Sequence, residues 1–177
     1  MLIGISGKKR SGKDTVGAMV VEWLTEHGFD AAQVAFADQL KDEVAEATGV
    51  NRRMQEMDKE RWRPILQWWG VEFRRHYFGQ DYWVSKMTQK LLAMDEDVAV
   101  VTDVRFRDEA DFIRASGGFV VRVERETGLQ DGHSSETDLD GYSGFQTTLS
   151  NDGTLDDLEE KVYRFMSQMH DLEMVAV

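Results

Sequence analysis

Hydrophobic and polar residues follow one another in blocks whose spacing predicts strands and helices in turn. Continuous apolar or β-branched runs predict buried strands, and hydrophobic positions three or four apart predict amphipathic helices. Strands are expected at 2–6, 33–37, 98–102, 119–124 and 147–150. Helices are expected at 13–27, 38–48, 61–78, 81–94, 107–115 and 155–170. This alternation predicts an α/β fold in which helices cover both faces of a mostly parallel sheet.

Two stretches do not fit a simple strand–helix repeat. Residues 38–94 carry only helical patterns and are too long for one crossover, so a helical insertion is expected there. Residues 125–146 are rich in Gly, Ser and Asp and predict a lid-like loop. We expect a single domain over 1–177, with ligands bound at the carboxyl ends of the strands.

Composition narrows the class of protein. With 177 residues, of which 41% are hydrophobic, the chain is long enough for a core and too apolar to be disordered. It has no apolar run of ~18 residues, and its start lacks the pattern of a secretory leader. The absence of cysteine excludes disulfides and thiolate chemistry. These features predict a cytoplasmic protein that does not bind membranes.

The net charge of −12 is unevenly distributed. Residues 1–125 hold 19 Lys and Arg against 21 Asp and Glu, whereas residues 126–177 hold 2 against 12. The overall charge disfavours binding to nucleic acid. A site for a small anionic ligand is therefore expected within the first 125 residues.

The segment 7–13 (GKKRSGK) fits the phosphate-binding pattern G-x-x-x-x-G-K. It follows an apolar strand and begins an amphipathic helix, which is the context that the pattern requires. Glycines let the backbone turn tightly, and the loop and helix N–H groups can then surround a phosphate. The lysine can reach the β- and γ-phosphates. The predicted phosphate-contacting residues are Gly7, Lys8, Arg10, Ser11, Gly12 and Lys13.

The residue after the lysine departs from the pattern, which usually has Ser or Thr there. Here it is Asp14, followed by Thr15. A carboxylate at this position can bind Mg²⁺ directly or through water. Alternatively, Asp14 is an acid favoured by the helix dipole. Thr15 can contact the α-phosphate region.

A second group of polar residues ends the apolar run 98–102. Asp103 comes at the end of this strand, where phosphate-loop proteins hold Mg²⁺ or its water, and Arg105 can bind a phosphate in a bidentate manner. In the alternative interpretation, Asp103 caps the next helix and Arg105 pairs with Glu109.

These two segments resemble those of phage-type deoxynucleoside monophosphate kinases. The glycine loop 4–15 (GISGKKRSGKDT) and the segment 102–110 (TDVRFRDEA) carry the resemblance most specifically. Further matches occur in the expected order at 36–41 (FADQLK), 66–75 (LQWWGVEFRR), 133–136 (HSSE) and 151–155 (NDGTL). Together they span nearly the whole chain. A glycine loop with Asp after Lys also occurs in a group of phosphomevalonate kinases.

The resemblance implies a phosphate-loop (P-loop) NTPase fold and the Mg²⁺-dependent reaction ATP + dNMP → ADP + dNDP. It implies that residues 7–15 bind the ATP phosphates and that Asn151 approaches the adenine. Lys13, Asp103 and Arg105 would carry catalysis, with Asp14 and Asp103 at the metal. Residues near the acceptor nucleotide would be Asp38, Lys41, Arg74, Arg75 and Arg105.

The aromatic helix at 61–78 offers Trp68 or Trp69 for stacking on a nucleobase, although most of its aromatic residues suit a core. A homodimer is compatible with the resemblance, but no hydrophobic stripe indicates one. If the chain is phage-encoded, the host cytoplasm is the expected setting.

Two other functions remain open from the sequence. A P-loop kinase could instead act on another small acceptor, such as dephospho-coenzyme A or phosphomevalonate. A non-catalytic nucleotide-binding module is the alternative of a different class, and the presence of both Asp14 and Asp103 argues against it.

Overall fold

The computed structural model describes residues 1–128 and 132–172, and the chain divides into two compact units. Unit 1 consists of Met1–Val34 and Asp95–Val177, and unit 2 of Ala35–Met94. Within the described residues, every strand belongs to unit 1, and unit 2 is built of helices.

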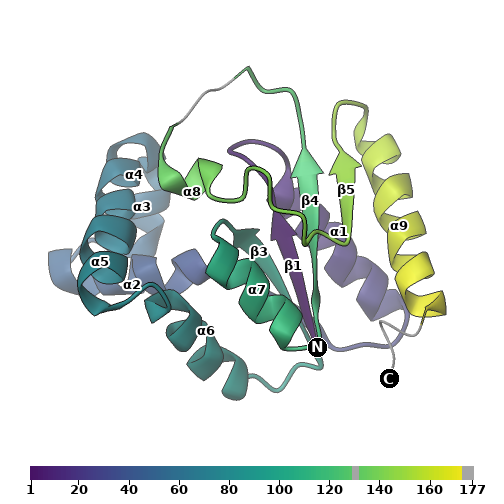
Figure 1. Ribbon diagram of the computed structural model, residues 1–177, viewed down its shortest axis with the longest axis horizontal. Helices are drawn as coiled ribbons and strands as arrows, with labels where there is room; N and C mark the ends of the chain where they lie inside the picture. The colour runs from purple at the N-terminus through teal and green to yellow at the C-terminus, as the bar shows by residue number, and fades with distance from the viewer. Residues whose placement is uncertain (129–131, 173–177) are drawn as a thin grey trace. The chain divides into compact units, whose positions relative to one another are not determined.

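A parallel sheet is the framework of unit 1 (Figure 1). The strands that the structure describes are β1 (Leu2–Ser6), β2 (Ala31–Val34), β3 (Val98–Val104), β4 (Phe119–Glu124) and β5 (Thr147–Ser150). Their order is β2-β3-β1-β4-β5, and every neighbouring pair is parallel. In the central strand, Ile3 pairs with Val100 on one side and Phe119 on the other. The predicted α/β fold with a mostly parallel sheet is thus confirmed.

Helices cover both faces of this sheet. On one face α1 (Lys13–Glu26) packs beside α9 (Leu155–Asp171), and their buried residues form the main core with the strands. On the other face lies α7 (Arg107–Ala115). Gly4 lets α7 approach closely, because a Cβ there would lie 2.8 Å from Ile113 Cδ1. The short helix α8 (Ser134–Thr137) lies between β4 and β5 in the chain.

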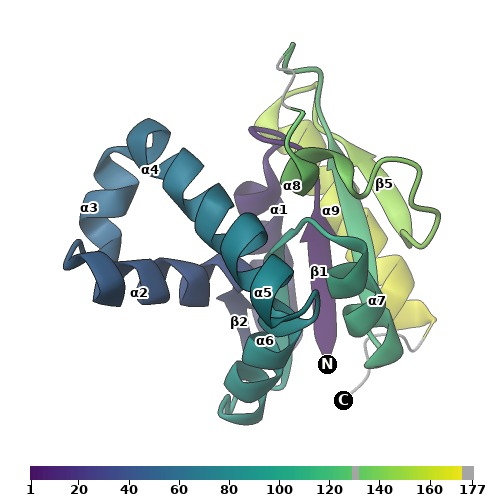
Figure 2. The same ribbon diagram turned by 60° about the vertical axis from the view of Figure 1, so that its left-hand side comes forward.

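Unit 2 contains α2 (Phe36–Thr48), α3 (Arg52–Met57), α4 (Lys59–Gln67), the π-helix η1 (Trp68–Arg75), α5 (His76–Phe78) and α6 (Tyr82–Leu92). Figure 2 shows α3 joining α2 to the long run of α4, η1 and α5. Trp83 is buried, and its indole N–H donates to the Gly70 carbonyl across 2.9 Å. This bond ties α6 to η1.

Several helices and strands have bounds that differ from those predicted from the sequence. The second strand, expected at 33–37, occupies Ala31–Val34, and its helix already begins at Phe36. Asp38 therefore does not precede the helix; it lies in the first turn and accepts a hydrogen bond from the Ala35 N–H at 3.3 Å. The helices α3 and α8 were not predicted, because their short segments show no hydrophobic period.

The predicted helix at 61–78 is helical throughout but is not one α-helix. It comprises most of α4, then η1 and α5, and Pro64 lies within α4. A π-helix brings residues five apart together, which an α-helical pattern does not anticipate. The lid-like stretch 125–146 contains α8, and its residues 129–131 lie outside those described.

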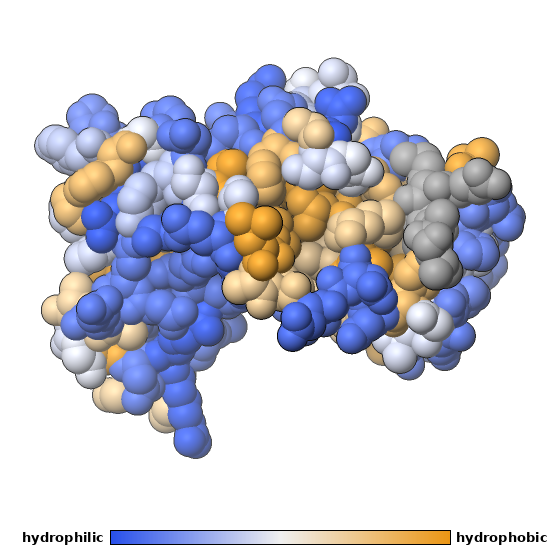
Figure 3. Space-filling view, turned by 90° about the horizontal axis from the view of Figure 1, so that it is seen from below, coloured by the Kyte–Doolittle hydropathy of each residue, from blue (hydrophilic) through white to orange (hydrophobic). Residues whose placement is uncertain are grey.

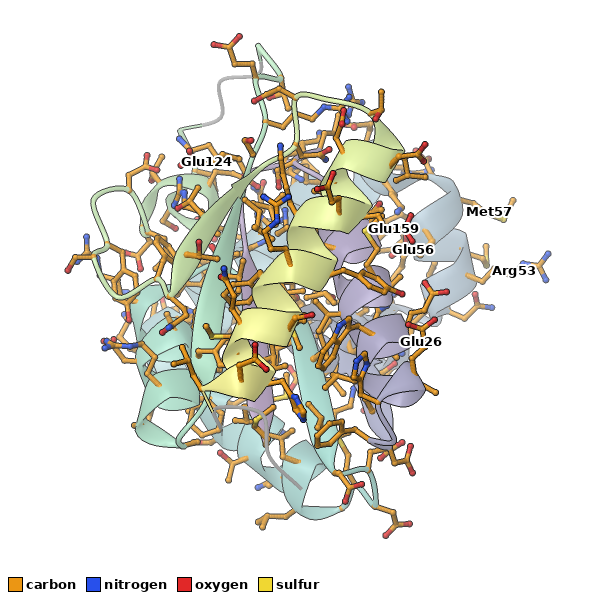
Figure 4. The ribbon with its side chains drawn as sticks, turned by 90° about the vertical axis from the view of Figure 1, so that its right-hand side faces the viewer. Glu26, Arg53, Glu56, Met57, Glu124 and Glu159 are labelled. Atoms are coloured by element: carbon orange, nitrogen blue, oxygen red, sulfur yellow. The ribbon has the colours of Figure 1, made fainter. Side chains whose placement is uncertain are left out.

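Seen from below, hydrophobic side chains gather near the middle of the view (Figure 3). On the outer side of the helix pair, Glu26 of α1 and Glu159 of α9 are exposed (Figure 4). No helix in the described part of the chain is long and apolar enough to span a membrane.

Candidate active site

The glycine loop runs from the end of β1 to the start of α1, as the pattern predicts. Gly7 and Gly12 have φ angles of 151° and 98°, which side chains rarely allow. A Cβ at Gly7 would lie 2.4 Å from the Val123 carbonyl oxygen, and one at Gly12 would lie 2.3 Å from Asn151 Nδ2. Glycine is therefore required at both ends of the loop by backbone conformation and by space.

Asn151 supports the loop from the end of β5. Its buried side-chain amide donates to the Ser11 carbonyl at 2.8 Å, and the Ser11 N–H in turn donates to the Lys8 carbonyl at 3.1 Å. The structure thus brings Asn151 to the loop that the sequence assigned to ATP. Its contact with the adenine stays a prediction.

Lys13 is the first residue of α1, and its side chain is buried against the loop. Its Nζ donates to the Lys8 carbonyl at 2.8 Å. Burial, followed by the nearby Arg105 guanidinium, lowers the pKa of Lys13 to about 8, although Glu136, Asp14 and Asp103 oppose the change. The ammonium thus lies where negative charge is in short supply, and a bound phosphate would supply it.

Of the three carboxylates that act on the pKa of Lys13, two are the predicted metal ligands. Asp103 is the sixth residue of β3 and half-buried, and Asp14 is exposed in the first turn of α1. No cluster of three or more His, Cys, Asp or Glu suited to a metal occurs among the described residues. Two oxygen donors nevertheless fit Mg²⁺, which binds few carboxylates and completes its shell with phosphates and water.

Arg105 follows β3, and Glu109 lies in the first turn of α7. The Glu109 carboxylate accepts from the backbone N–H groups of Arg105, at 2.8 Å, and Phe106, at 3.1 Å, at the start of α7. The guanidinium of Arg105 pairs with Glu136 and donates to the Ser135 carbonyl at 3.2 Å. The pairing of Arg105 with Glu109 considered from the sequence thus occurs through the Arg105 backbone N–H, where the carboxylate caps α7.

A small pocket lies beside the loop in unit 1. It is lined by the loop, the end of β3, β4 and α8, and its charged residues are Lys8, Arg105, Arg122 and Glu136. Lys8 also pairs with Asp140 at 3.1 Å. Arg122, Glu136 and Asp140 were not predicted as site residues. The segment 133–136 was matched by resemblance, but nothing in its pattern indicates a buried acid.

Unit 2 contains a second charged cluster, centred on Glu43. This carboxylate accepts from Arg74 Nε at 2.7 Å, from the Trp69 indole N–H at 3.2 Å and from the Tyr82 hydroxyl. Burial alone would raise the pKa of Glu43, but these hydrogen bonds lower it below its usual value. Burial and Glu43 raise the pKa of Tyr82 to about 12. Sequence reasoning missed Glu43 and Tyr82, since each lies within an ordinary helical pattern.

Aromatic rings surround the guanidinium of Arg74. Its Cζ lies 4.8–5.8 Å from the ring centroids of Trp69, Phe73, Phe78 and Tyr82. Trp69 and Arg74 are five residues apart in η1, so the π-helix places them together. Trp68, also predicted to stack on a base, is exposed and lies parallel to Phe73 with centroids 5.7 Å apart.

The remaining predicted acceptor residues lie elsewhere in unit 2. Asp38 pairs with Arg52 at 2.6 Å and Lys90 at 2.8 Å, and Lys41 pairs with Glu56 at 2.6 Å. Arg75 is buried, and its guanidinium donates to the Gln80 carbonyl at 2.8 Å. Arg74 and Arg75 are neighbours in sequence, and Arg74 is the one whose guanidinium is fixed by Glu43.

Known proteins resemble this chain in both sequence and fold. A protein of Acanthamoeba polyphaga mimivirus, named provisionally as a deoxynucleotide monophosphate kinase, is 26% identical over 92% of this chain and 94% of its own length. The deoxynucleoside-5′-monophosphate kinase of Escherichia phage T5 is 30% identical over 58% of this chain, but the match covers only 44% of that enzyme.

The fold also resembles that of solved kinases. Shikimate kinase from Aquifex aeolicus vf5 matches with a TM-score of 0.51 over 96% of this chain and 98% of that one, at 12% identity. This likeness concerns the fold alone and establishes it as that of P-loop kinases.

The family model of deoxynucleotide monophosphate kinases matches residues 38–162, well over half of the chain. The match includes all the candidate residues of unit 2 from Asp38 onward, together with Asp103, Arg105 and Asn151. The chain therefore belongs to the deoxynucleotide monophosphate kinase family and is a kinase of deoxynucleoside monophosphates.

Proposed function

We propose that this kinase transfers the γ-phosphoryl group of ATP to the phosphate of a deoxynucleoside monophosphate, with Mg²⁺, to give ADP and the diphosphate. The observation that carries this proposal is the buried Lys13 at a glycine loop whose conformation excludes side chains at Gly7 and Gly12. The family match supports the acceptor class.

The loop is the proposed site of the ATP phosphates. Backbone N–H groups of the loop other than those of Lys9 and Ser11, together with the start of α1, favour an anion there. Lys13 would exchange its bond to the Lys8 carbonyl for phosphate oxygens. Because the pKa of Lys13 is lowered by burial and by Arg105, bound phosphate also relieves an unfavourable charge.

Asp14 and Asp103 are the proposed holders of Mg²⁺, directly or through its water. When bound, the metal neutralises charge on the phosphates that react. Both carboxylates act on the pKa of Lys13, which supports their placement on the same side of the loop. Asp14 is exposed and so can bind a hydrated ion without losing an internal partner.

Catalysis of this kind needs no covalent nucleophile from the protein. The acceptor phosphate is itself the nucleophile, and phosphoryl transfer depends on positioning and on neutralising charge. Lys13 and Arg105 supply fixed positive charge in unit 1. Arg105 is the proposed partner of phosphate oxygens at the reacting centre.

Unit 2 is the proposed nucleotide-acceptor insertion, in keeping with its separate helical structure. Arg74 is its best candidate for the acceptor phosphate, because its Nε is fixed by Glu43 and its side chain is one-fifth exposed. Trp69 and Trp68 are the candidates for base stacking. Asp38 and Lys41 stay candidates for the nucleoside. Arg75 suits a structural role better, since it is buried on the Gln80 carbonyl.

The segment 125–146 is proposed as the lid of unit 1, since it contributes Glu136 and Asp140 to the loop surroundings. Small nucleotides are the proposed partners, and the viral and phage relatives favour a host cytoplasm as the setting.

A coupled assay of ADP release tests the proposal most broadly. The acceptors are the four dNMPs, dUMP and a modified pyrimidine monophosphate, with dephospho-coenzyme A and phosphomevalonate as competitors, each with ATP and Mg²⁺. Turnover with at least one dNMP and none with the two competitors is expected. Turnover confined to a competitor, or nucleotide binding without any turnover, would overturn the proposal.

A further inference from the structure

Glu136 is a buried acid that the proposed mechanism has not yet used. It lies in α8, and only 3% of its side chain is exposed. One carboxylate oxygen, Oε2, accepts from the Lys9 N–H of the glycine loop at 2.8 Å. The other, Oε1, accepts from the guanidinium of Arg105. A single carboxylate thus connects the loop that follows β1 to the arginine that follows β3.

An acid in this position is unexpected at a site for anions. A buried carboxylate is costly unless charge and hydrogen bonds compensate it, and here both oxygens are compensated by groups of the site itself. Lys13 is also near enough for Glu136 to act on its pKa. Glu136 therefore offsets the repulsion between Lys13 and Arg105, the two cations that would bind phosphate. Its hydrogen bond also fixes the position of the Arg105 guanidinium.

The helix that carries Glu136 is itself anchored. The His133 ring accepts from the Ser135 N–H at 3.2 Å and bonds to the Ser135 hydroxyl at 2.8 Å. The backbone carbonyl of Ser135 accepts a second hydrogen bond from the Arg105 guanidinium at 3.2 Å. Arg105 thus meets two acceptors from α8, which restrict the directions in which its remaining N–H groups can point.

We propose that Glu136 is a positioning residue for phosphoryl transfer, whose carboxylate ties the Arg105 guanidinium to the glycine loop so that the arginine faces the reacting phosphates. This inference rests on the proposed function and assigns Glu136 a role through Arg105, without direct contact with substrate. A merely structural acid would stabilise the fold and leave the action of Arg105 unaffected.

The two roles differ in how substitutions combine. Glu136→Gln keeps the size of the side chain but loses the charge, and an amide cannot accept from Lys9 and Arg105 as a carboxylate does. If Glu136 acts through Arg105, this variant loses kcat/KM for the dNMP by about 10- to 100-fold, the range expected for loss of a charge-assisted bond. The KM for ATP stays within about threefold, because the loop glycines and Lys13 are unchanged.

The deciding experiment is a double-mutant cycle with Arg105→Ala. We expect the variant carrying both substitutions to be no less active than Arg105→Ala alone, because the acid then has no arginine to hold. Losses that multiply in the double variant would overturn the proposal, as would near-normal kcat/KM in Glu136→Gln. If the wild-type protein shows no turnover with any dNMP, the proposed function itself is refuted.

Two further variants distinguish a loss of activity caused by misfolding from one caused by a displaced Arg105. Asp138→Asn is the matched control, since Asp138 follows α8, its carboxylate accepts from the Arg107 N–H, and its carbonyl accepts from Arg107 Nε. It should retain wild-type kinetics. If Glu136→Gln does not fold, Glu136→Asp, which keeps the charge, takes its place in the cycle. The proposal is supported if Glu136→Asp is partly active and adds no further loss of kcat/KM to Arg105→Ala. It is contradicted if the two losses multiply.

Discussion

Both units hold an arginine with a glutamate, but they do so in different surroundings. In unit 1, Glu136 joins Arg105 to the Lys9 N–H of the glycine loop, and Arg105 also donates to the Ser135 carbonyl of α8. In unit 2, Glu43 joins Arg74 to the polar edges of Trp69 and Tyr82, and aromatic rings flank the guanidinium.

The difference indicates a division of work. In unit 1, burial and then the Arg105 guanidinium lower the pKa of Lys13, and a bound phosphate would raise it again. The aromatic setting in unit 2 offers flat surfaces beside a fixed cation, which suits a nucleoside that carries one phosphate. We therefore propose that unit 1 carries out phosphoryl transfer and that unit 2 selects the acceptor.

The largest expected effect is the loss of charge in unit 1. Lys13→Ala should lower kcat by about 10²- to 10³-fold while the protein stays folded, because removing one preorganised charge from a transition state has that size of effect. Steady-state kinetics and circular dichroism check both parts. Lys161→Ala removes a lysine bonded only to Ser150 in the contacts shown and should behave as wild type. Near-normal turnover in Lys13→Ala would refute the assigned chemistry of unit 1.

A smaller effect is expected from the arginine of unit 1. Arg105→Ala should raise the KM for the dNMP by about 10- to 100-fold, since it removes charge-assisted bonds to phosphate. Initial rates at saturating ATP measure this change. The control is Arg164→Ala, whose side chain is 66% exposed and pairs with Glu160. An unchanged acceptor KM together with a normal kcat would count against Arg105.

The smallest effect concerns the acids of unit 2. Asp38, Glu43 and Glu56 have pKa values below their usual 3.8 and 4.5: burial would raise them, but their partners prevail. Their contribution to stability is therefore complete above those usual values and is lost as the pH falls through the lower folded-state values.

A Glu43 variant tests how much of this loss of stability at acid pH comes from Glu43. Between neutral pH and pH 3.5, the melting temperature of wild type should fall further than that of Glu43→Gln, because only wild type loses the contribution of this carboxylate. Tryptophan fluorescence suits the measurement because four of the five tryptophans lie in unit 2. Equal losses in the two proteins would show that the Glu43 cluster contributes no stability.

The same contrast explains what the sequence could predict. The glycine loop was predictable residue by residue, because Gly7 and Gly12 meet a backbone requirement that few other residues can meet. The sheet was predictable because short, continuous apolar runs such as 98–102 usually form buried parallel strands.

Long-range pairs were not predictable. Glu136 lies 31 residues from Arg105 and 127 from Lys9, and its segment carries no periodic signal. The Arg74 cluster depends on the π-helix, where contacts between residues five apart replace the α-helical spacing. Both sites thus depend on tertiary structure that local patterns do not encode.

Binding of each nucleotide alone tests the division between the units most directly. Titration calorimetry would give the Kd of ATP with Mg²⁺, and separately of the preferred dNMP, for wild type, Lys13→Ala and Arg74→Ala, with Arg53→Ala on the exposed side of α3 as the control (Figure 4). The account predicts that Lys13→Ala weakens ATP alone and that Arg74→Ala weakens the dNMP alone, each by about tenfold or more. If Arg74→Ala instead weakens ATP as much as the dNMP, or changes neither, the division is contradicted.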